Sequence, residues 1–110
     1  MEARMIADGF AVAGQIGIEH VQAIANYGFK SLICNRPDHE EGAVAHDAIE
    51  AAALQAGMQF HFLPVVSGAI TAENAADMAR IIRSAPKPIL AYCRTGGRCT
   101  NLFALAQAAG

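Results

Sequence analysis

The sequence predicts one α/β domain over residues 1–110, built on a mainly parallel sheet of four to five strands flanked by helices. Two observations support this fold class. Short apolar runs alternate along the chain with segments in which apolar residues recur at helical spacing. In addition, 54% of the residues are hydrophobic and 16% are charged, which suits one compact core. An alternating order of this kind favours parallel strands with helices on both faces.

The first half of the chain supplies two strand signals and two helix signals. Residues 9–14 and 29–34 are short apolar runs typical of strands, and we expect Cys34 in the core. Between them lie apolar residues at helical spacing and a glycine placed to end a helix, namely Ile18, Val21, Ile24, Ala25 and Gly28. A second helix is predicted over residues 45–56, with Gly57 after it, and its small side chains indicate close packing on the sheet.

The second half of the chain repeats this pattern. Residues 59–65 indicate a third strand, in which His61 is expected to be a packed or surface histidine. Thr71 can cap the next helix, and residues 88–92 indicate the last strand. The inward faces of the last two helices are expected to carry Ala75, Met78, Ala79 and Ile82, and then Leu102, Leu105 and Ala106. The sequence ends directly after this helix, which leaves open whether the protein continues beyond residue 110.

Composition and charge argue against several classes of function. The formal net charge of −2 provides no basic face for nucleic acid, and no stretch reaches the roughly 18 apolar residues of a membrane span. The first residues lack the apolar region of a signal peptide, so we expect a cytoplasmic protein. Three cysteines without paired spacing suit reduced thiols rather than disulfides or zinc. We therefore expect no metal, no cofactor, no nucleic acid and no membrane partner.

The segment between the last strand and the last helix has the arrangement of an anion-binding loop. It reads Cys93-Arg94-Thr95-Gly96-Gly97-Arg98. Backbone N–H groups of such a turn, and of the first helical turn, can point at one bound anion, and glycines let the backbone approach it closely. The planar guanidinium group of arginine adds paired N–H donors that fit the oxygens of phosphate or sulfate. Near helix N-termini and cations the pKa of cysteine falls to about 3.5–7.5, which favours a nucleophilic Cys93 thiolate. The alternative is an inert buried cysteine beside an ordinary turn.

A polar segment, residues 35–42, follows the second predicted strand. Open α/β sheets place their ligand groups at the carboxyl ends of strands, where this segment begins. Arg36 could face an anion, and Asp38, Glu40 or Glu41 could hold a proton donor. The alternative is a solvated connection whose acidic residues favour the N-terminus of the next helix.

Three of these segments together resemble the phosphatase-like domain of the β-lactamase-hydrolase-like family: Asn35-Arg36-Pro37-Asp38, Pro64-Val65, and Cys93 to Arg98. This small bacterial domain occurs alone or fused to a metallo-β-lactamase-fold partner, and the resemblance covers nearly the whole chain. It implies a fold similar to dual-specificity and tyrosine phosphatases. It also implies Cys93 as nucleophile, Arg98 as the phosphate-binding arginine, the backbone of residues 94–97 as the cradle, and Asp38 as a candidate acid.

The sequence also departs from the phosphatase pattern. Phosphatases of this fold usually have one more residue between cysteine and arginine, whereas Cys93 and Arg98 enclose four, as in the persulfide-holding loop of rhodanese sulfurtransferases. Tyr92 stands where a histidine is common, and Cys99 stands where a hydroxyl residue is common. The loop after the third strand, often the source of the acid, reads Val66-Ser67-Gly68. Loss of a general acid costs about 10²–10⁴-fold in rate, so phosphatase activity should be weak unless Asp38 substitutes.

Three hypotheses follow for Cys93. In the first, a phosphatase-like hydrolase, the thiolate attacks a phosphate ester held by Arg98 and the loop amides. In the second, a sulfurtransferase, Cys93 accepts sulfane sulfur as a persulfide and passes it to a thiol. In the third, a non-catalytic oxyanion or redox sensor, Cys93 is oxidised and Cys99 or Cys34 resolves the sulfenic acid. The first two have a small anionic substrate as partner, and the family resemblance adds a metallo-β-lactamase-fold partner.

Overall fold

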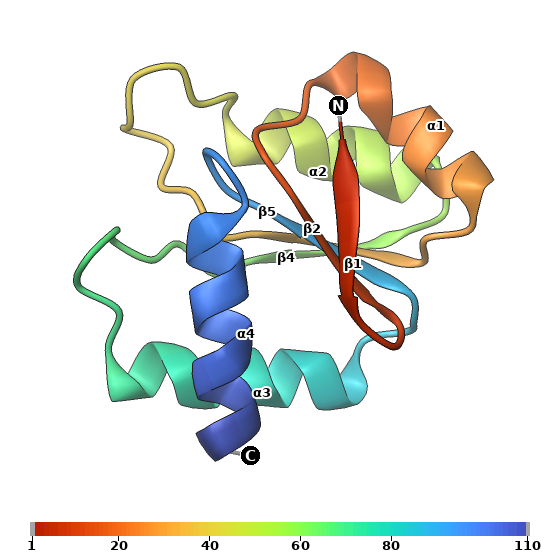
Figure 1. The fold of residues 1–110 in the computed structure, drawn as a ribbon. Helices are drawn as coiled ribbons and strands as arrows, with labels where there is room; N and C mark the ends of the chain where they lie inside the picture. Colours follow the sequence, from red (N-terminus) through yellow and green to blue (C-terminus); the bar gives the residue numbers. More distant parts are fainter. Residues whose placement is uncertain (1, 110) are drawn as a thin grey trace.

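Residues 2–109, which the computed structural model describes, form five strands and four helices (Figure 1). In chain order these are β1 (Ala3–Ala7), β2 (Phe10–Ala13), α1 (Ile18–Tyr27), β3 (Ser31–Cys34), α2 (His46–Gln55), β4 (Gln59–Phe62), α3 (Ala72–Ser84), β5 (Ile89–Tyr92) and α4 (Gly97–Ala109). The predicted alternation of strands and helices is confirmed from β2 onward. Thr71 caps α3 as expected, since its side chain accepts a hydrogen bond from the backbone of Asn74.

The strands form a single sheet in the order β1-β2-β5-β3-β4. β2, β5, β3 and β4 run parallel, and β1 pairs antiparallel with β2 at the edge. The prediction of a mainly parallel sheet is therefore confirmed. β1 was not among the predicted strands, because its first three residues are exposed and carry no buried apolar run. It forms because the chain reverses at Gly9, whose φ of +73° suits a glycine in a tight turn.

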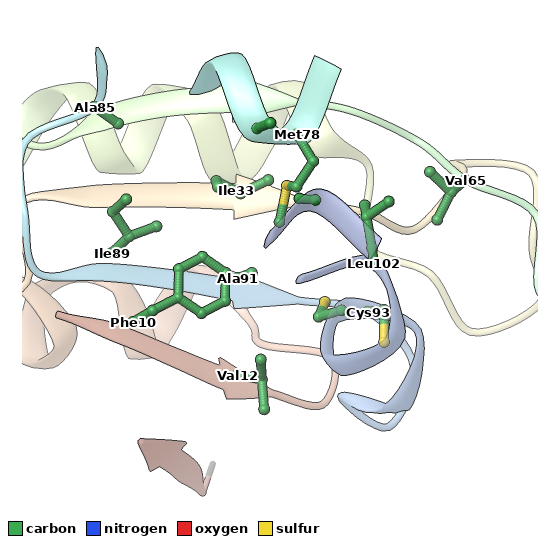
Figure 2. Close-up of a cluster of buried hydrophobic side chains, with 13 residues drawn as sticks. Phe10, Val12, Ile33, Val65, Met78, Ala85, Ile89, Ala91, Cys93 and Leu102 are labelled. Atoms are coloured by element: carbon green, nitrogen blue, oxygen red, sulfur yellow. The ribbon is translucent and has the colours of Figure 1, made fainter. Parts of the chain in front are cut away.

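Each face of the sheet is covered by a pair of helices, α1 and α2 on one side and α3 and α4 on the other (Figure 1). The alternation of side chains along β5 sorts its residues between the two cores. Leu90 and Tyr92 pack on the α1/α2 side, whereas Ile89, Ala91 and, one residue past the strand, Cys93 pack on the α3/α4 side. Figure 2 shows this second cluster, with Cys93 beside the start of the last helix.

Two residues of the predicted apolar stripes are exposed. Ile18 is the first residue of α1 and is 51% exposed, and Leu105 on α4 is 46% exposed. The buried stripe of α4 is narrower than predicted, because it consists of Cys99, Leu102 and Ala106. Leu105 lies beside this stripe, about 100° around the helix from Ala106. The other predicted core residue of interest, Cys34, is buried.

The parallel strands determine where the predicted site segments meet. The carboxyl ends of β2, β5, β3 and β4 lie at one edge of the sheet, where open α/β folds place their ligand groups. The segments that leave this edge are the turn after β2, the 35–42 loop after β3, residues 63–71 after β4 and the 93–96 loop after β5. Backbone hydrogen bonds tie them together, such as Asn35 N–H to the carbonyl of Tyr92 and Val65 N–H to the carbonyl of Asn35.

Candidate active site

The loop between β5 and α4 wraps around the sulfur of Cys93. The backbone N–H of Gly96 donates to Cys93 Sγ at 3.1 Å. Gly96 has a φ of +93°, and a Cβ there would lie 3.5 Å from the backbone of Ala13. A glycine is therefore favoured by the left-handed backbone conformation, whereas a Cβ would meet β2 only at an ordinary contact distance. Gly97 begins α4, and its N–H donates to the Thr95 hydroxyl.

The surroundings of Cys93 favour its thiolate. A hydrogen bond from the Cys99 thiol, together with backbone N–H groups of Cys99, Thr95 and Gly96, lowers the pKa of Cys93 to about 5 against the opposing effect of burial. Burial and the neighbouring Cys93 raise the pKa of Cys99 well above its ordinary value, so Cys99 remains a protonated donor. Cys93 is therefore ionised at neutral pH.

Cys93 opens into a pocket of about 600 Å³. The pocket is lined by Arg36, Glu40, Glu41, Ser67, Cys93, Arg94, Thr95 and Arg98. Of the residues predicted to bind an anion, the four side chains of Arg36, Arg94, Thr95 and Arg98 line this pocket, and Gly96 and Gly97 belong to the loop beneath it. Cys93 itself is only 1% exposed, so it is reached through the pocket rather than from the open surface.

Arg98 is held by an acidic partner from the 35–42 loop. Its Nη1 donates to Glu40 Oε2 at 2.8 Å and to the carbonyl of Val65 at 3.0 Å, and its Nη2 donates to Glu40 Oε1 at 3.2 Å. Hydrogen bonds from Arg98, and then from Arg36, lower the pKa of Glu40. Glu40, one of the candidate proton donors, is therefore ionised at neutral pH and is an ion-pair partner of the arginine that was expected to hold the substrate.

Arg36 is the second cation on this carboxylate. Its Nε donates to Glu40 Oε1 at 3.0 Å, its Nη1 to Gln15 Oε1 at 3.0 Å and its Nη2 to the carbonyl of Glu41 at 2.6 Å. The guanidinium is thus fixed in position, and Arg36 is only 4% exposed. Such a buried arginine is stable because each of its nitrogens has a partner.

Asp38 lies at the N-terminus of α2 and is not among the residues that line the pocket. Its Oδ1 accepts a hydrogen bond from the backbone N–H of His46 at 2.9 Å, and its Oδ2 lies 2.7 Å from His46 Nδ1. Partial burial raises the pKa of Asp38, but the hydrogen bonds from His46 outweigh it and the net pKa is lowered. This arrangement matches the helix-terminus alternative for the acids of this loop, and a role as general acid stays a prediction.

Gln15, Val65 and Ser67 were not predicted as site residues. Gln15 and the Val65 carbonyl hold the two arginines, and Ser67 lines the pocket. Their common signal is position, because each follows the carboxyl end of a parallel strand. Within residues 2–109, no group of three or more His, Cys, Asp or Glu side chains is placed to hold a metal ion, and no helix is long and apolar enough to cross a membrane.

A mainly parallel α/β sheet with a cysteine loop between strand and helix, a thiolate at its centre and arginines that line the pocket is the arrangement expected of a phosphatase-like domain. Comparison with known proteins agrees. The family model described as "Beta-lactamase hydrolase-like protein, phosphatase-like domain" matches residues 2–110, and the chain belongs to this family. The β-lactamase hydrolase-like protein of Xylella fastidiosa is 33% identical over 103 residues, which make up 93% of this chain and 24% of that protein.

Solved structures extend the likeness to the fold. The crystal structure of nma1982 from Neisseria meningitidis has a TM-score of 0.79 at 32% identity, over 96% of this chain and 87% of that one. The core catalytic domain of the phosphatase SIW14 from S. cerevisiae has a TM-score of 0.70 at 16% identity, over 91% of this chain and 61% of that one. The latter likeness shows the fold alone. The chain spans about a quarter of the length of the curated relatives that it matches.

Proposed function

We propose that this domain is a cysteine-dependent, phosphatase-like hydrolase in which the Cys93 thiolate attacks a phosphate ester. The observation that carries the proposal is a cysteine with a pKa of about 5 beneath a pocket lined by Arg36, Arg94 and Arg98. A thiolate is the nucleophilic form of cysteine, and arginines with backbone N–H groups are the donors that hold phosphate oxygens. Membership of the phosphatase-like family supports this choice of substrate.

The reaction has two steps. The Cys93 sulfur forms a bond to phosphorus while the bond from phosphorus to the leaving-group oxygen breaks, and the loop amides and Arg98 stabilise the charge on the other phosphate oxygens. Water then attacks the phosphocysteine, which releases inorganic phosphate and restores the thiolate. The hydrogen bonds from Cys99 and Gly96 make the thiolate a good leaving group in this second step.

The supply of a proton to the leaving group limits the substrates. The lowered pKa values of Glu40 and Asp38 leave both carboxylates ionised at neutral pH. We therefore propose that hydrolysis is confined to esters of acidic alcohols, such as aryl phosphates, whose leaving groups need no proton. Should Asp38 supply the proton, Asp38→Asn would slow esters with poor leaving groups far more than aryl phosphates.

A second candidate function is sulfur transfer, and two observations favour it. The loop from Cys93 to Arg98 is one residue shorter than usual for a phosphatase, and Glu40 already occupies two of the donors of Arg98. The Cys93 thiolate would attack the outer sulfur of a sulfane donor and keep that sulfur as a persulfide. The rest of the donor would leave as an anion, which is sulfite from thiosulfate or a thiolate from an organic persulfide. An acceptor thiolate would then take this sulfur and restore Cys93. Neither step needs a general acid.

Intact-mass analysis and phosphate release distinguish the two candidates. A phosphatase releases inorganic phosphate from an aryl phosphate, whereas a sulfurtransferase gains about 32 Da, the mass of one sulfur atom, after incubation with thiosulfate or polysulfide. Cys93→Ser should abolish either activity without loss of the fold, and Cys34→Ser is the matched control on the other face of the sheet. Phosphate release without a mass gain supports hydrolysis, and the reverse supports sulfur transfer. Turnover unchanged in Cys93→Ser would remove this cysteine from the mechanism.

A further inference from the structure

Glu40 places a carboxylate among the donors that an incoming oxyanion would use. The side chain accepts two hydrogen bonds from Arg98, at 2.8 and 3.2 Å, and a third from Arg36 at 3.0 Å. All three side chains line the pocket, and Glu40 is 23% exposed whereas Arg98 and Arg36 are 8% and 5% exposed, so the carboxylate is the most accessible of the three charges. Among residues 2–109, the buried Nε of Arg98 has no hydrogen-bond partner, so this arginine is not fully saturated.

The charges that line the pocket balance. Arg36, Arg94 and Arg98 contribute three positive charges, and Glu40, Glu41 and the Cys93 thiolate contribute three negative ones. A dianion that enters this pocket gains little overall attraction and must also displace or approach the Glu40 carboxylate. A reactant with one negative charge meets about half of this repulsion, and a neutral reactant meets none.

We propose that Glu40 is the specificity-determining residue of this pocket, which disfavours doubly charged oxyanions and admits reactants with a single negative charge or none. The inference rests on the proposed function only in that substrates enter the pocket above Cys93. For hydrolysis it selects the singly charged form of an aryl phosphate monoester over its dianion. For sulfur transfer it selects organic persulfides and organic polysulfides, whose sulfur chains carry one negative charge or none, over the thiosulfate dianion.

The test uses two tetrahedral anions that differ by one charge, sulfate and methanesulfonate. Each is titrated, at constant ionic strength and pH 8, against the rate at which iodoacetamide alkylates Cys93. Protection of the thiolate reports binding and needs no turnover, so its outcome is independent of the reaction that the domain catalyses. In the unmodified protein we expect methanesulfonate to protect at a lower concentration than sulfate does.

Three variants assign the effect to Glu40. Glu40→Gln keeps the size of the side chain. It should lower the concentration of sulfate needed for half-protection about tenfold and change that of methanesulfonate by less than about threefold. Glu40→Asp keeps the charge and should keep the preference for methanesulfonate. Glu41→Gln is the matched control, because it removes the same charge from the same pocket, while Glu41 contacts Arg36 only through its backbone carbonyl.

Several results would overturn the proposal. One is tighter protection by sulfate than by methanesulfonate in the unmodified protein, which can be measured even if Glu40→Gln fails to fold. Another is an equal gain in sulfate binding in Glu40→Gln and Glu41→Gln. This would assign the effect to the net charge of the pocket rather than to the Glu40 carboxylate that is bound to Arg98. Absence of protection by both anions in Glu40→Gln would also contradict it, whereas activity lost in Cys93→Ser bears only on the proposed function.

Discussion

The Cys99 thiol, directly after Arg98 in the sequence, lowers the pKa of Cys93 by hydrogen bonding to its thiolate. The sequence suggested that a thiol in place of a hydroxyl residue would be a weaker donor. The structure gives it more importance, because this hydrogen bond is the largest single cause of the lowered pKa of Cys93. Cys99 is fully buried, so water cannot replace it as a donor.

Removal of this donor should raise the pKa of Cys93. In the unmodified protein the rate of alkylation by iodoacetamide should rise with pH through about 5 and level off above it, because the thiolate predominates above its pKa. Cys99→Ala should move this midpoint upward by about one pH unit or more, whereas Cys99→Ser restores a donor and should keep it low. The pH profile of Cys93 alkylation, followed by peptide mass analysis, measures both. An unchanged midpoint in Cys99→Ala would show that the backbone amides suffice.

Residues that are close in the sequence could be assigned to the site, and residues that are distant could not. Cys93, Arg98 and the glycines between them form one segment whose chemistry is visible in the sequence. Arg36 was predicted to face an anion, and the anion that it contacts is Glu40 of the protein itself. The bridge from Glu40 to Arg98 joins positions 58 residues apart, and no local pattern in a single sequence encodes such a pair.

At the scale of the structural element, the 93–96 loop depends on one glycine more than on the other. Gly96 has a φ of +93°, whereas Gly97 is the first residue of α4 and has no positive φ; the nearest atoms to a Cβ lie at ordinary contact distances of 3.4 Å at both positions. Both glycines were predicted to belong to the anion cradle, but the sequence could not show which of them requires the left-handed conformation.

Gly96→Ala should therefore destabilise the domain by about 1–2 kcal/mol, because an alanine resists the positive φ of this position. It should also raise the pKa of Cys93, since the Gly96 N–H is one of the donors to the sulfur. The matched variant Gly97→Ala should change stability by less than about 0.5 kcal/mol, because alanine is favourable at the start of a helix. Urea unfolding and the alkylation profile measure the two effects, and similar losses in both variants would argue against a special role for Gly96.

Across the whole molecule, the sheet separates two apolar clusters, and Cys93 belongs to the one beneath α3 and α4 (Figure 2). The fold class was predictable because the alternation of apolar runs and helical stripes extends along most of the chain. Edge strand β1 was missed because its side chains are mostly exposed, and Leu105 was misplaced because helical spacing does not say how wide the buried stripe is. The same cluster supports the site, since the start of α4 carries Gly97, Arg98 and Cys99.

Leu102 connects the stability of this core to the chemistry of the loop. It is fully buried on α4, one turn after Cys99 and in the same cluster as Cys93. Leu102→Ala should lower the free energy of unfolding by about 2–5 kcal/mol and the melting temperature by at least about 10 °C. The cavity that it leaves removes contacts that support the first turn of α4. Leu105→Ala deletes the same atoms from a half-exposed position on the same helix and should cost less than about 1 kcal/mol. Thermal unfolding compares the two variants, and alkylation well below the melting temperature shows whether Cys93 keeps its low pKa. Equal losses of stability in the two variants would mean that α4 is not anchored through Leu102.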